Sequence, residues 1–579
     1  MRYLLKVSSY TRYKTIHDMK KILFYLFAMV ASCAIILTSC SEKEEAPAPI
    51  EDSVFVYVNL NQLIQKGAFE EFITPDNRRL VATALSSQIE NIEYADALSA
   101  ITQDLNATGV DFAGIAYAYL CDDLKSLAIV ANILDTAQLN STISLLSYLL
   151  VESGEDALDI RVSGDINTFN YNDATVAYND SRIAIILSDD ENSENFAVEA
   201  ITRAKSDTSI FGADDIAMLV NYERLISLAN SEIEIRTTEL NNQLDKGEIS
   251  HTDYTEGVEW VNRLREIVDS YQSNFSAGAK SIISANFDQG IAKLSCQNEG
   301  INYGEYATLF KSTNSTHLAN LSSDAYAVMG LGVNGKTLSE FVRTRLNKEF
   351  LSSIGINPTN ELNMILSIAC DALSTVDGGV TLALDSIDGK IKRSYNYYWD
   401  EYSTTPEIKN IEAMLMVDVL DTYIINNIAQ FAGMFLKEVD PMHYTLRLMN
   451  YNLSMGQDNN LLHLGVNMTP KEQTPSALDS LWAKDIEGSI GYIAVNIDAL
   501  AGSEFMRSIN KIITSNIIKE YQPIYTNSME AIEYIYASAE SLDFVEIAVV
   551  FNDKSTNALK QINKIVLPVV VNQTIKGII

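Results

Sequence analysis

The sequence predicts an α+β protein built from two tandem copies of one domain. Each copy should be a mainly antiparallel sheet covered by helices, because short apolar runs flank turn signals and amphipathic segments lie between them. The duplication is predicted by a repeated unit, a strand that ends in Val-Asn with Leu four residues after the Asn. The copies lie at Val58-Asn59, Val220-Asn221, Val333-Asn334 and Val495-Asn496.

The spacing of these four copies is the stronger observation. Asn59 and Asn221 are 162 residues apart, as are Asn334 and Asn496, and the second pair begins 275 residues after the first. Solenoid repeats have periods of about 20–50 residues, so this period indicates duplication of a whole domain. A Leu-Asp-Thr triplet also recurs at a similar offset. We expect repeats at 54–320 and 321–579.

The N-terminus predicts export and lipidation. Met19-Lys20-Lys21 and the apolar run 22–37 resemble a signal peptide, with Met19 as the expected true start. The run is too short to be a transmembrane span. It ends in Leu37-Thr38-Ser39-Cys40, which resembles a bacterial lipobox. We therefore expect a signal peptide at 1–39, a lipidated (palmitate-bearing) Cys40 and a charged, proline-containing tether over 40–53.

The residue after the lipobox cysteine predicts the destination. Ser41 rather than Asp follows Cys40, which in lipoprotein sorting implies the outer membrane. The acidic stretch 41–45 resembles the tag that exports Bacteroidetes lipoproteins to the cell surface. Whether the protein faces the periplasm or the cell surface stays open. The expected membrane contact is the N-terminal lipid anchor.

The composition limits the classes of partner that the protein is expected to bind. The apolar content of 47% is that of a globular protein, and the length requires more than one domain. The net charge of −34 argues against nucleic acid as a partner, because binding to phosphate backbones needs basic surfaces. We expect a protein or glycan partner and no nucleic acid.

Several elements can be placed from local pattern. The continuous apolar run Val54–Val58 predicts a strand in the middle of a sheet, buried on both faces. Asn59 or Asn61 should cap the helix that follows. Two amphipathic segments, 222–245 and 252–275, predict an αα-hairpin. Further helices are expected over 76–100 and 514–537, and 545–551 is expected to be the closing strand.

One known motif occurs, at the third Val-Asn copy. Residues Gly330–Thr337 fit the phosphate-loop pattern G-x-x-x-x-G-K-[ST]. An exported protein meets little nucleoside triphosphate, the copy at Asn59 has no Gly or Lys, and a phosphate loop needs a parallel sheet. A glycine-rich turn between strand and helix is therefore the favoured interpretation, and phosphate binding stays the alternative.

The other reactive residues predict no cofactor and no metal site. The five histidines lack metal-ligand spacing, with His443 expected in a turn and His463 in a strand. Cys121 and Cys296 form the one cysteine pair for which a disulfide is worth testing. No spacing typical of a nucleophile or of paired catalytic groups is recognisable, so no catalytic residue is assigned.

The candidate binding residues lie in an aromatic insert of the second repeat. This insert contains Tyr395, Tyr397, Tyr398, Trp399 and Tyr402. Aromatic side chains anchor many interfaces and stack on sugar rings. The alternative is that the insert extends its flanking strands or packs on its own domain.

With its lipobox, tether and duplicated Val-Asn units, the mature chain resembles an uncharacterised Bacteroidetes lipoprotein family, domain of unknown function 4836. The resemblance implies an envelope location and a two-part body but no activity. The expected function is that of a non-catalytic outer-membrane lipoprotein with a binding or structural role. The alternative is a hydrolase that acts on envelope or dietary polysaccharide through paired carboxylates.

Overall fold

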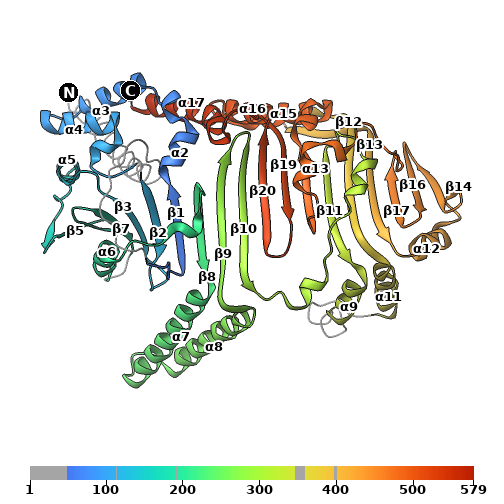
Figure 1. Ribbon diagram of the computed structural model, residues 1–579, viewed down its shortest axis with the longest axis horizontal. Helices are drawn as coiled ribbons and strands as arrows, with labels where there is room; N and C mark the ends of the chain where they lie inside the picture. Colours follow the sequence, from blue (N-terminus) through green and yellow to red (C-terminus); the bar gives the residue numbers. More distant parts are fainter. Residues whose placement is uncertain (1–47, 113, 189–191, 346–358, 397–400, 579) are drawn as a thin grey trace. The chain divides into compact units, whose positions relative to one another are not determined.

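The protein forms two compact units in a computed structural model that describes residues 48–112, 114–188, 192–345, 359–396 and 401–578 (Figure 1). Unit 1 comprises Met1–Asp288, Asn298–Ile301 and Asn557–Ile579, and unit 2 comprises Gln289–Gln297 and Asn302–Thr556. Helices and antiparallel strands make up both units, which confirms the α+β class. These units are defined by packing, and the predicted repeats at 54–320 and 321–579 stay a prediction.

Unit 1 contains an antiparallel sheet. Its strand order is β4-β5-β6-β7-β3-β2-β1-β8-β9. The strands are β1 (Val54–Asn59), β2 (Ile115–Leu120), β3 (Leu127–Asn132), β4 (Arg161–Ser163), β5 (Ile166–Tyr171), β6 (Ala174–Tyr178), β7 (Arg182–Leu187), β8 (Ile216–Asn221) and β9 (Phe275–Asp288). As predicted, β1 lies inside the sheet, between β2 and β8.

One face of this sheet carries the core of unit 1. Phe55 of β1 is fully buried and stacks on Tyr117 and Phe211, with ring centroids 5.4 and 6.0 Å apart. Helix α6 covers the same face through Ala197 and Ala200. The helices of unit 1 are α2 (Leu60–Gly67), α3 (Pro75–Ser86), α4 (Ile92–Gln103), α5 (Thr136–Glu152), α6 (Ser193–Thr202), α7 (Tyr222–Asp245), α8 (His251–Gln272) and α17 (Ala558–Ile578).

The last helix, α17, completes unit 1 from the far end of the chain. Asn563, which is buried, donates a hydrogen bond from Nδ2 to the carbonyl oxygen of Gly67 at 2.8 Å. Lys560 forms an ion pair with Glu71 at 2.6 Å. Residues almost 500 positions apart in sequence therefore pack in one unit.

Unit 2 repeats this strand order and extends it. Its order is β14-β15-β16-β17-β13-β12-β11-β18-β19-β20-β10, and every pair is antiparallel. The strands are β10 (Ile291–Ile301), of which 291–297 lie in unit 2, β11 (Ala327–Asn334), β12 (Val376–Asn396), β13 (Glu401–Val419), β14 (Lys437–Asp440), β15 (His443–Leu448), β16 (Tyr451–Asp458), β17 (Leu461–Val466), β18 (Gly491–Asn496), β19 (Ile532–Ala539) and β20 (Phe544–Phe551).

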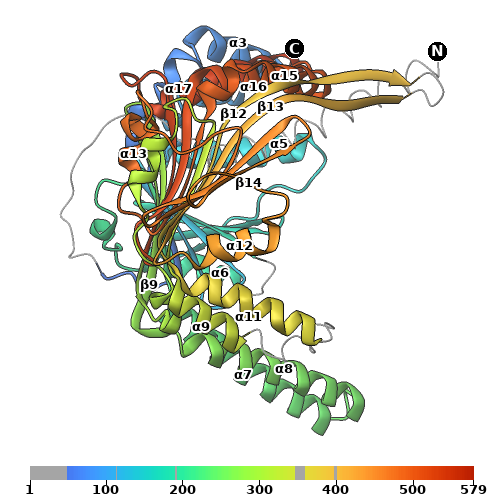
Figure 2. The same cartoon turned by 90° about the vertical axis from the view of Figure 1, so that its right-hand side faces the viewer.

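The core of unit 2 covers one face of its sheet. Leu318, Leu321 and Trp482, all buried, pack there against strand residues such as Met416 and Tyr536. Figure 2 shows α13 on this face, with α9, α11 and α12 on the other side at one end of the strands. The helices are α9 (Gly335–Arg345), α11 (Asn360–Ser374), α12 (Tyr423–Ala432), α13 (Leu481–Asp485), α14 (Ile497–Gly502), α15 (Glu504–Asn516), α16 (Gln522–Ala531) and a short 3-10 helix (Ser315–Asn320).

The repeated Asn residues are helix N-caps, as expected. The Oδ1 of Asn59 accepts a hydrogen bond from the backbone N–H of Gln62 at 3.1 Å. Asn221, Asn334 and Asn496 each accept one from the residue three positions later. Each cap satisfies a backbone donor that the first helical turn leaves without a partner. The Val-Asn unit is therefore a strand-to-helix junction that recurs four times.

Other expectations hold in part. The αα-hairpin is confirmed as α7 and α8. The helix expected over 76–100 is two helices, α3 and α4. The helix expected over 514–537 is instead the end of α15 followed by α16, and it is wrong at its end because β19 begins at Ile532. The alternating apolar positions of β19 pair with both neighbouring strands, and this tertiary pairing decides the conformation. The last strand is followed by α17.

The capping role predicts a stability difference between two neighbouring asparagines. Asn59→Ala should lower the free energy of unfolding by about 1 kcal/mol, because a backbone N–H of α2 loses its acceptor. Asn61→Ala on the exposed side of the same helix should change it by less than about 0.5 kcal/mol. Urea unfolding followed by circular dichroism measures both. Equal losses from the two substitutions would contradict the assignment of Asn59 as the cap.

Candidate functional site

The aromatic insert lies at the end of a long two-stranded arm. Strands β12 and β13 pair from Val376 to Asn396, whereas β11 accompanies β12 only as far as Leu384. Tyr395 on β12 pairs in register with Tyr402 on β13, and Tyr395 is 37% exposed. The insert therefore extends its flanking strands.

Most of the residues predicted from sequence lie outside the part that the structure describes. These are Tyr397, Tyr398, Trp399 and Cys40. Their binding and lipidation roles stay predictions. Within the described part of the arm, β12 is held by α15, because the N–H of Ile391 donates to Ser508 Oγ at 2.7 Å.

The glycines of the phosphate-loop match have packing roles in unit 2. A Cβ on Gly332 would lie 1.9 Å from the carbonyl oxygen of Lys311, and one on Gly330 would lie 2.3 Å from the ring of Tyr492. A Cβ on Gly335 would meet two backbone carbonyls at 2.1 Å. Gly330 and Gly332 lie within strand β11, which is antiparallel to both neighbours, and Gly335 is the first residue of α9. Close packing therefore accounts for the glycines. The expected glycine-rich turn is wrong for Gly330 and Gly332, because only Gly335 lies at the junction of strand and helix.

The most distinctive surface of unit 2 is the side of the sheet opposite its core. In antiparallel pairs, residues opposite each other project to the same face. One register row crosses eight strands and is aliphatic, alanine or methionine throughout. The row is Leu464, Leu415, Leu382, Met329, Ile493, Ala537, Ile547 and Leu294. None of the eight is buried, and Met329, Leu382 and Ile547 are 46–48% exposed.

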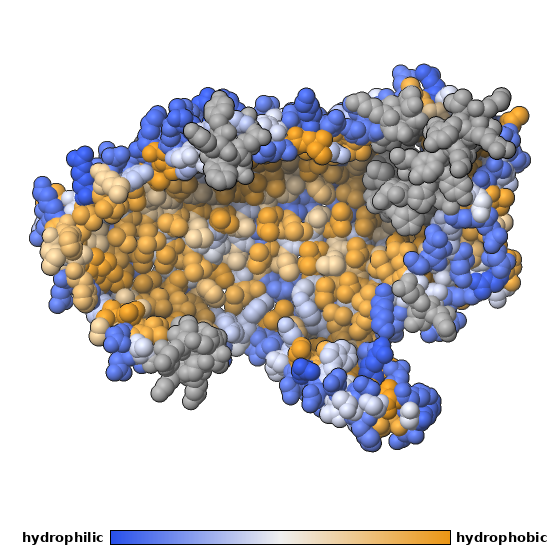
Figure 3. Space-filling model, turned by 180° about the vertical axis from the view of Figure 1, so that it is seen from behind, coloured by the Kyte–Doolittle hydropathy of each residue, from blue (hydrophilic) through white to orange (hydrophobic). Residues whose placement is uncertain are grey.

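Two parallel rows on the same face have the same character. One is Val466, Ala413, Leu384, Ala327, Val495, Ile535, Val549 and Ala292; the other is Leu462, Val417, Val380, Leu331, Gly491, Ala539, Val545 and Cys296. We call these 24 positions the apolar face. None is charged, aromatic or an amide. In Figure 3 apolar side chains gather over the left-hand part of the view, where unit 2 lies.

The size of the apolar face sets it apart from ordinary surface. With strands about 4.8 Å apart and same-face residues about 6.8 Å apart along a strand, each position covers roughly 33 Å². Val417 and Leu462 are buried, so the other 22 positions cover on the order of 700 Å². The largest apolar patch on a typical monomer is about 300–600 Å². Antiparallel sheets with one free face normally alternate apolar and polar residues. This sheet does not, so its free face is typical of a binding surface.

Helices border this face at one end of the strands. Ile425 of α12 is buried against Val417 and Leu462, which removes those two positions from solvent. Leu338 of α9 packs on the same cluster. Because these helices cover only that end, the first two rows remain accessible.

Unit 1 has a smaller version of the same surface. A row of six strands there contains Ile185, Ile129, Ala118, Val56, Met218 and Ile283, and none is buried. The predicted burial of 54–58 on both faces is therefore wrong. The face with Phe55 and Tyr57 is buried, but the face with Val56 is half-exposed. The continuous apolar run correctly indicated that the strand lies in the middle of the sheet. It did not indicate that one face of the strand is left half-exposed.

A buried polar cluster in unit 2 is the arrangement most similar to a hydrolase triad. His317 contacts Thr381 Oγ1 through Nδ1 at 2.9 Å and Asp418 Oδ1 through Nε2 at 3.1 Å. Although burial opposes it, hydrogen bonds from His317, the Gly379 N–H and Asn314 lower the pKa of Asp418. Thr381 has no exposed surface, so a substrate cannot reach its hydroxyl. The cluster instead holds the 3-10 helix on the sheet.

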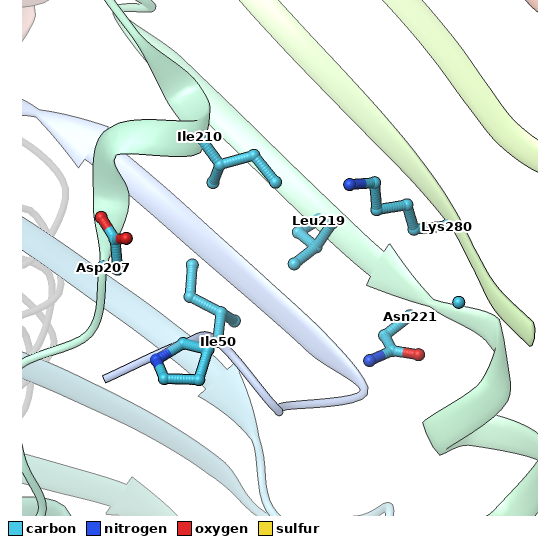
Figure 4. Close-up of a pocket in the computed structure, with 8 residues that line it drawn as sticks. Ile50, Asp207, Ile210, Leu219, Asn221 and Lys280 are labelled. Atoms are coloured by element: carbon cyan, nitrogen blue, oxygen red, sulfur yellow. The ribbon is translucent and has the colours of Figure 1, made fainter. Parts of the chain in front are cut away.

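A pocket in unit 1 is too small to define a ligand. Figure 4 shows Ile50, Asp207 and Ile210 facing Leu219, Asn221 and Lys280. Its volume is about 230 Å³. Pockets for small molecules usually measure about 300–1,000 Å³.

Cys121 of unit 1 is a free, buried thiol, so it does not pair with Cys296. Burial raises the pKa of Cys121 to about 12.

Fold and surface together define a class: an α+β protein in which an antiparallel sheet has one packed face and one accessible apolar face. Residues 46–559 match the family model described as domain of unknown function 4836, DUF4836. The chain belongs to this family, as the sequence pattern suggested. Within the described residues, no helix is long and apolar enough to span a membrane.

Comparison with solved structures adds distant matches. Crystal form IV of TP0453 aligns with 10% identity over 42% of this chain and 76% of that chain, with a TM-score of 0.20. Crystal form III aligns with 11% identity over 44% of this chain and 79% of that chain, with a TM-score of 0.21. Such scores are too low to support an argument. A search of curated proteins finds no match.

The packing of the glycines predicts how the phosphate-loop match responds to substitution. Gly332→Ala should lower the free energy of unfolding by about 3 kcal/mol, because the new methyl group overlaps the Lys311 carbonyl. Lys336→Ala, at an exposed position, should change it by less than about 0.5 kcal/mol. Denaturant unfolding tests both. ATP binding by the parent chain that Lys336→Ala abolishes would instead support a phosphate site.

Proposed function

We propose that this protein is a lipid-anchored envelope protein that binds the hydrocarbon chains of an amphiphile on the apolar face of unit 2. The observation that carries the proposal is the set of 24 register-matched apolar positions. Covering each 100 Å² of such surface contributes about 2.5 kcal/mol before the costs of binding. One row spans seven strand spacings, or roughly 34 Å, which is comparable with the hydrocarbon thickness of a bilayer, about 30 Å.

The composition of the apolar face favours a hydrocarbon chain over a protein partner. Cores of protein interfaces are enriched in aromatic residues and Arg, and interfaces form about one hydrogen bond per 100–200 Å². The apolar face has no aromatic residue, no Arg and no side-chain amide or hydroxyl. Its backbone groups are already used by neighbouring strands. An aliphatic chain requires no hydrogen bond from the surface that binds it.

The N-terminal sequence supports the envelope location. Lipidation of Cys40 and the tether over 41–53 would hold the folded body beside a membrane. The outer membrane is the proposed site, and the Bacteroidetes origin and the choice between periplasmic and cell-surface faces belong to the same proposal. Because the anchor would hold the apolar face beside the outer membrane, this face would exchange amphiphiles with the lipids of that membrane. The aromatic arm at Tyr395–Tyr402 would contact a polar part of the ligand or a glycan.

We also propose that the two units arose by duplication of one domain. The strand order of unit 1 recurs in unit 2, with β11 in the place of β1 and β18 in the place of β8. The four Asn caps occupy matching junctions. An experimental structure in which Asn59 and Asn334 occupy unrelated elements would contradict this duplication.

A charge placed on the apolar face tests the binding proposal. Ile493→Asp should weaken binding of a fluorescent long-chain fatty acid at least tenfold, a loss of about 1.4 kcal/mol or more, because the carboxylate would be buried against hydrocarbon. The mature chain 40–579 with Cys40→Ala is titrated with the probe, and lipids that copurify are measured by mass spectrometry.

Ile518→Asp is the matched control, since Ile518 is 65% exposed and lies outside the apolar face. It should bind the probe as the parent does. Equal binding by parent and Ile493→Asp would remove the apolar face from the site. A lipid-free dimer that Ile493→Asp dissociates would assign this face to a second copy of the chain. Turnover of envelope or dietary polysaccharide, lost on replacement of one carboxylate, would favour the hydrolase alternative.

Lipidation is tested separately by Cys40→Ala in the full-length gene. The variant should lose its acyl modification and leave the outer-membrane fraction, because the thiol that carries the anchor is gone. Metabolic labelling with an alkyne fatty acid and cell fractionation measure these changes. A Cys40→Ala protein that keeps both the label and the parent's membrane location would contradict the anchor.

A further inference from the structure

Two histidines and an aspartate meet at the edge meander of unit 2. Strand register aligns His443 of β15 with Gly456 of β16, and Gly456 with His463 of β17. Asp458 follows two residues after Gly456 and therefore projects from the same face of β16. These three side chains come from three adjacent strands, although their positions along the chain show no ligand spacing.

Gly456 makes the meeting of the two imidazoles possible. Strands two apart in a sheet are roughly 9.6 Å from each other, so the rings must approach across the middle strand. A Cβ at Gly456 would lie 2.3 Å from the ring of His443 and 2.6 Å from the ring of His463. The ring centroids are 5.8 Å apart. Any larger residue at 456 would occupy the space over which the rings face each other.

The donor atoms have the separation that one metal ion requires. One ligand atom from each of the three residues lies within 4.8 Å of the other two. His443 Nε2 and Asp458 Oδ2 are 3.3 Å apart. Two ligands that are each about 2.05 Å from a tetrahedral ion lie roughly 3.3 Å apart. The His443–Asp458 pair therefore already has a suitable spacing, and His463 completes a set of three by a small adjustment.

Burial holds one ligand rigid and leaves the others accessible. His463 is 3% exposed, and among the described residues its Nδ1 has no hydrogen-bond partner. Buried polar atoms usually have a partner, so this nitrogen is an exception that requires a physical reason. The side chains of His443 and Asp458 are 29% and 63% exposed, which leaves a path for an ion and water. On the outer side, His443 Nδ1 lies 3.0 Å from the Pro441 carbonyl oxygen, an arrangement that orients the ring.

We propose that His443, Asp458 and His463 bind a divalent first-row transition metal ion, with Zn²⁺ as the expected ligand in vitro. Two imidazoles and one carboxylate suit such ions, whereas Mg²⁺ and Ca²⁺ prefer oxygen ligands throughout. Three protein ligands leave a coordination position for water, as in open zinc sites. A bound ion would also satisfy the polar requirements of the buried His463 ring.

This site is independent of the apolar face. His463 lies between Leu462 and Leu464 on β17, so its side chain projects from the opposite side of the strand. It pairs in register with Met416, which belongs to the packed core. Metal binding and hydrocarbon binding can therefore succeed or fail separately. The sequence analysis missed the site because only the register of β15, β16 and β17 brings the ligands together.

Titration of the mature chain 40–579 with Zn²⁺ tests the proposal. After removal of metal by a chelator, isothermal titration calorimetry should show one saturable equivalent, and Zn²⁺ should raise the melting temperature because it binds the folded state. Asp458→Asn and His443→Gln should each weaken binding at least about tenfold, since loss of a ligand costs no less than loss of an outer hydrogen-bond partner. Mg²⁺ should cause no shift.

The control is His251→Gln, because His251 is exposed at the start of α8, in unit 1. This variant should bind Zn²⁺ as the parent does. Asp458 is exposed, so Asp458→Asn should fold, and circular dichroism will verify it. His463→Gln adds a test of the buried ligand. The proposal is overturned if the parent shows no saturable binding, or if Asp458→Asn and His443→Gln bind with the parent's affinity.

Discussion

The alternation of side chains along paired strands is the constraint on which this structure depends. A strand presents successive residues to opposite faces, and a slip of one residue would exchange those faces. In unit 2 the packed face carries Met416, Tyr492 and Tyr536, all of which are buried in the core. The three rows of the apolar face on the other side carry only aliphatic residues, Met329, Gly491 and Cys296. Register therefore separates a core from a binding surface within one sheet.

The same constraint explains what the sequence could and could not predict. The Val-Asn junctions were predictable because a cap acts over three residues, and Asn59 and Asn496 behave alike. The strand Val54–Asn59 was placed correctly inside a sheet. Its apolar run could not show that the face with Val56 is only partly buried, because burial of that face depends on segments distant in sequence. The C-terminal helix was missed for a related reason: its partners are residues of unit 1, such as Gly67.

Site prediction depended on the same distinction between local and non-local information. The phosphate-loop match is a local pattern, and packing of Gly332 against Lys311 gives it a structural explanation. The metal-ligand cluster has no local pattern, since His443 and His463 are two strands apart. Motif spacing detects sites that are built on one loop or helix. Sites built across a sheet require the pairing of strands, which one sequence does not supply.

The position of α17 has a consequence for how the protein is made. Unit 1 begins near the N-terminus, but Lys560 and Asn563 supply part of its packing. During synthesis the first unit must therefore wait for residues 560–563 before this packing is complete. Until then the surfaces of α2 that meet α17 are exposed. Loss of α17 by proteolysis would therefore damage the beginning of the protein as well as its end.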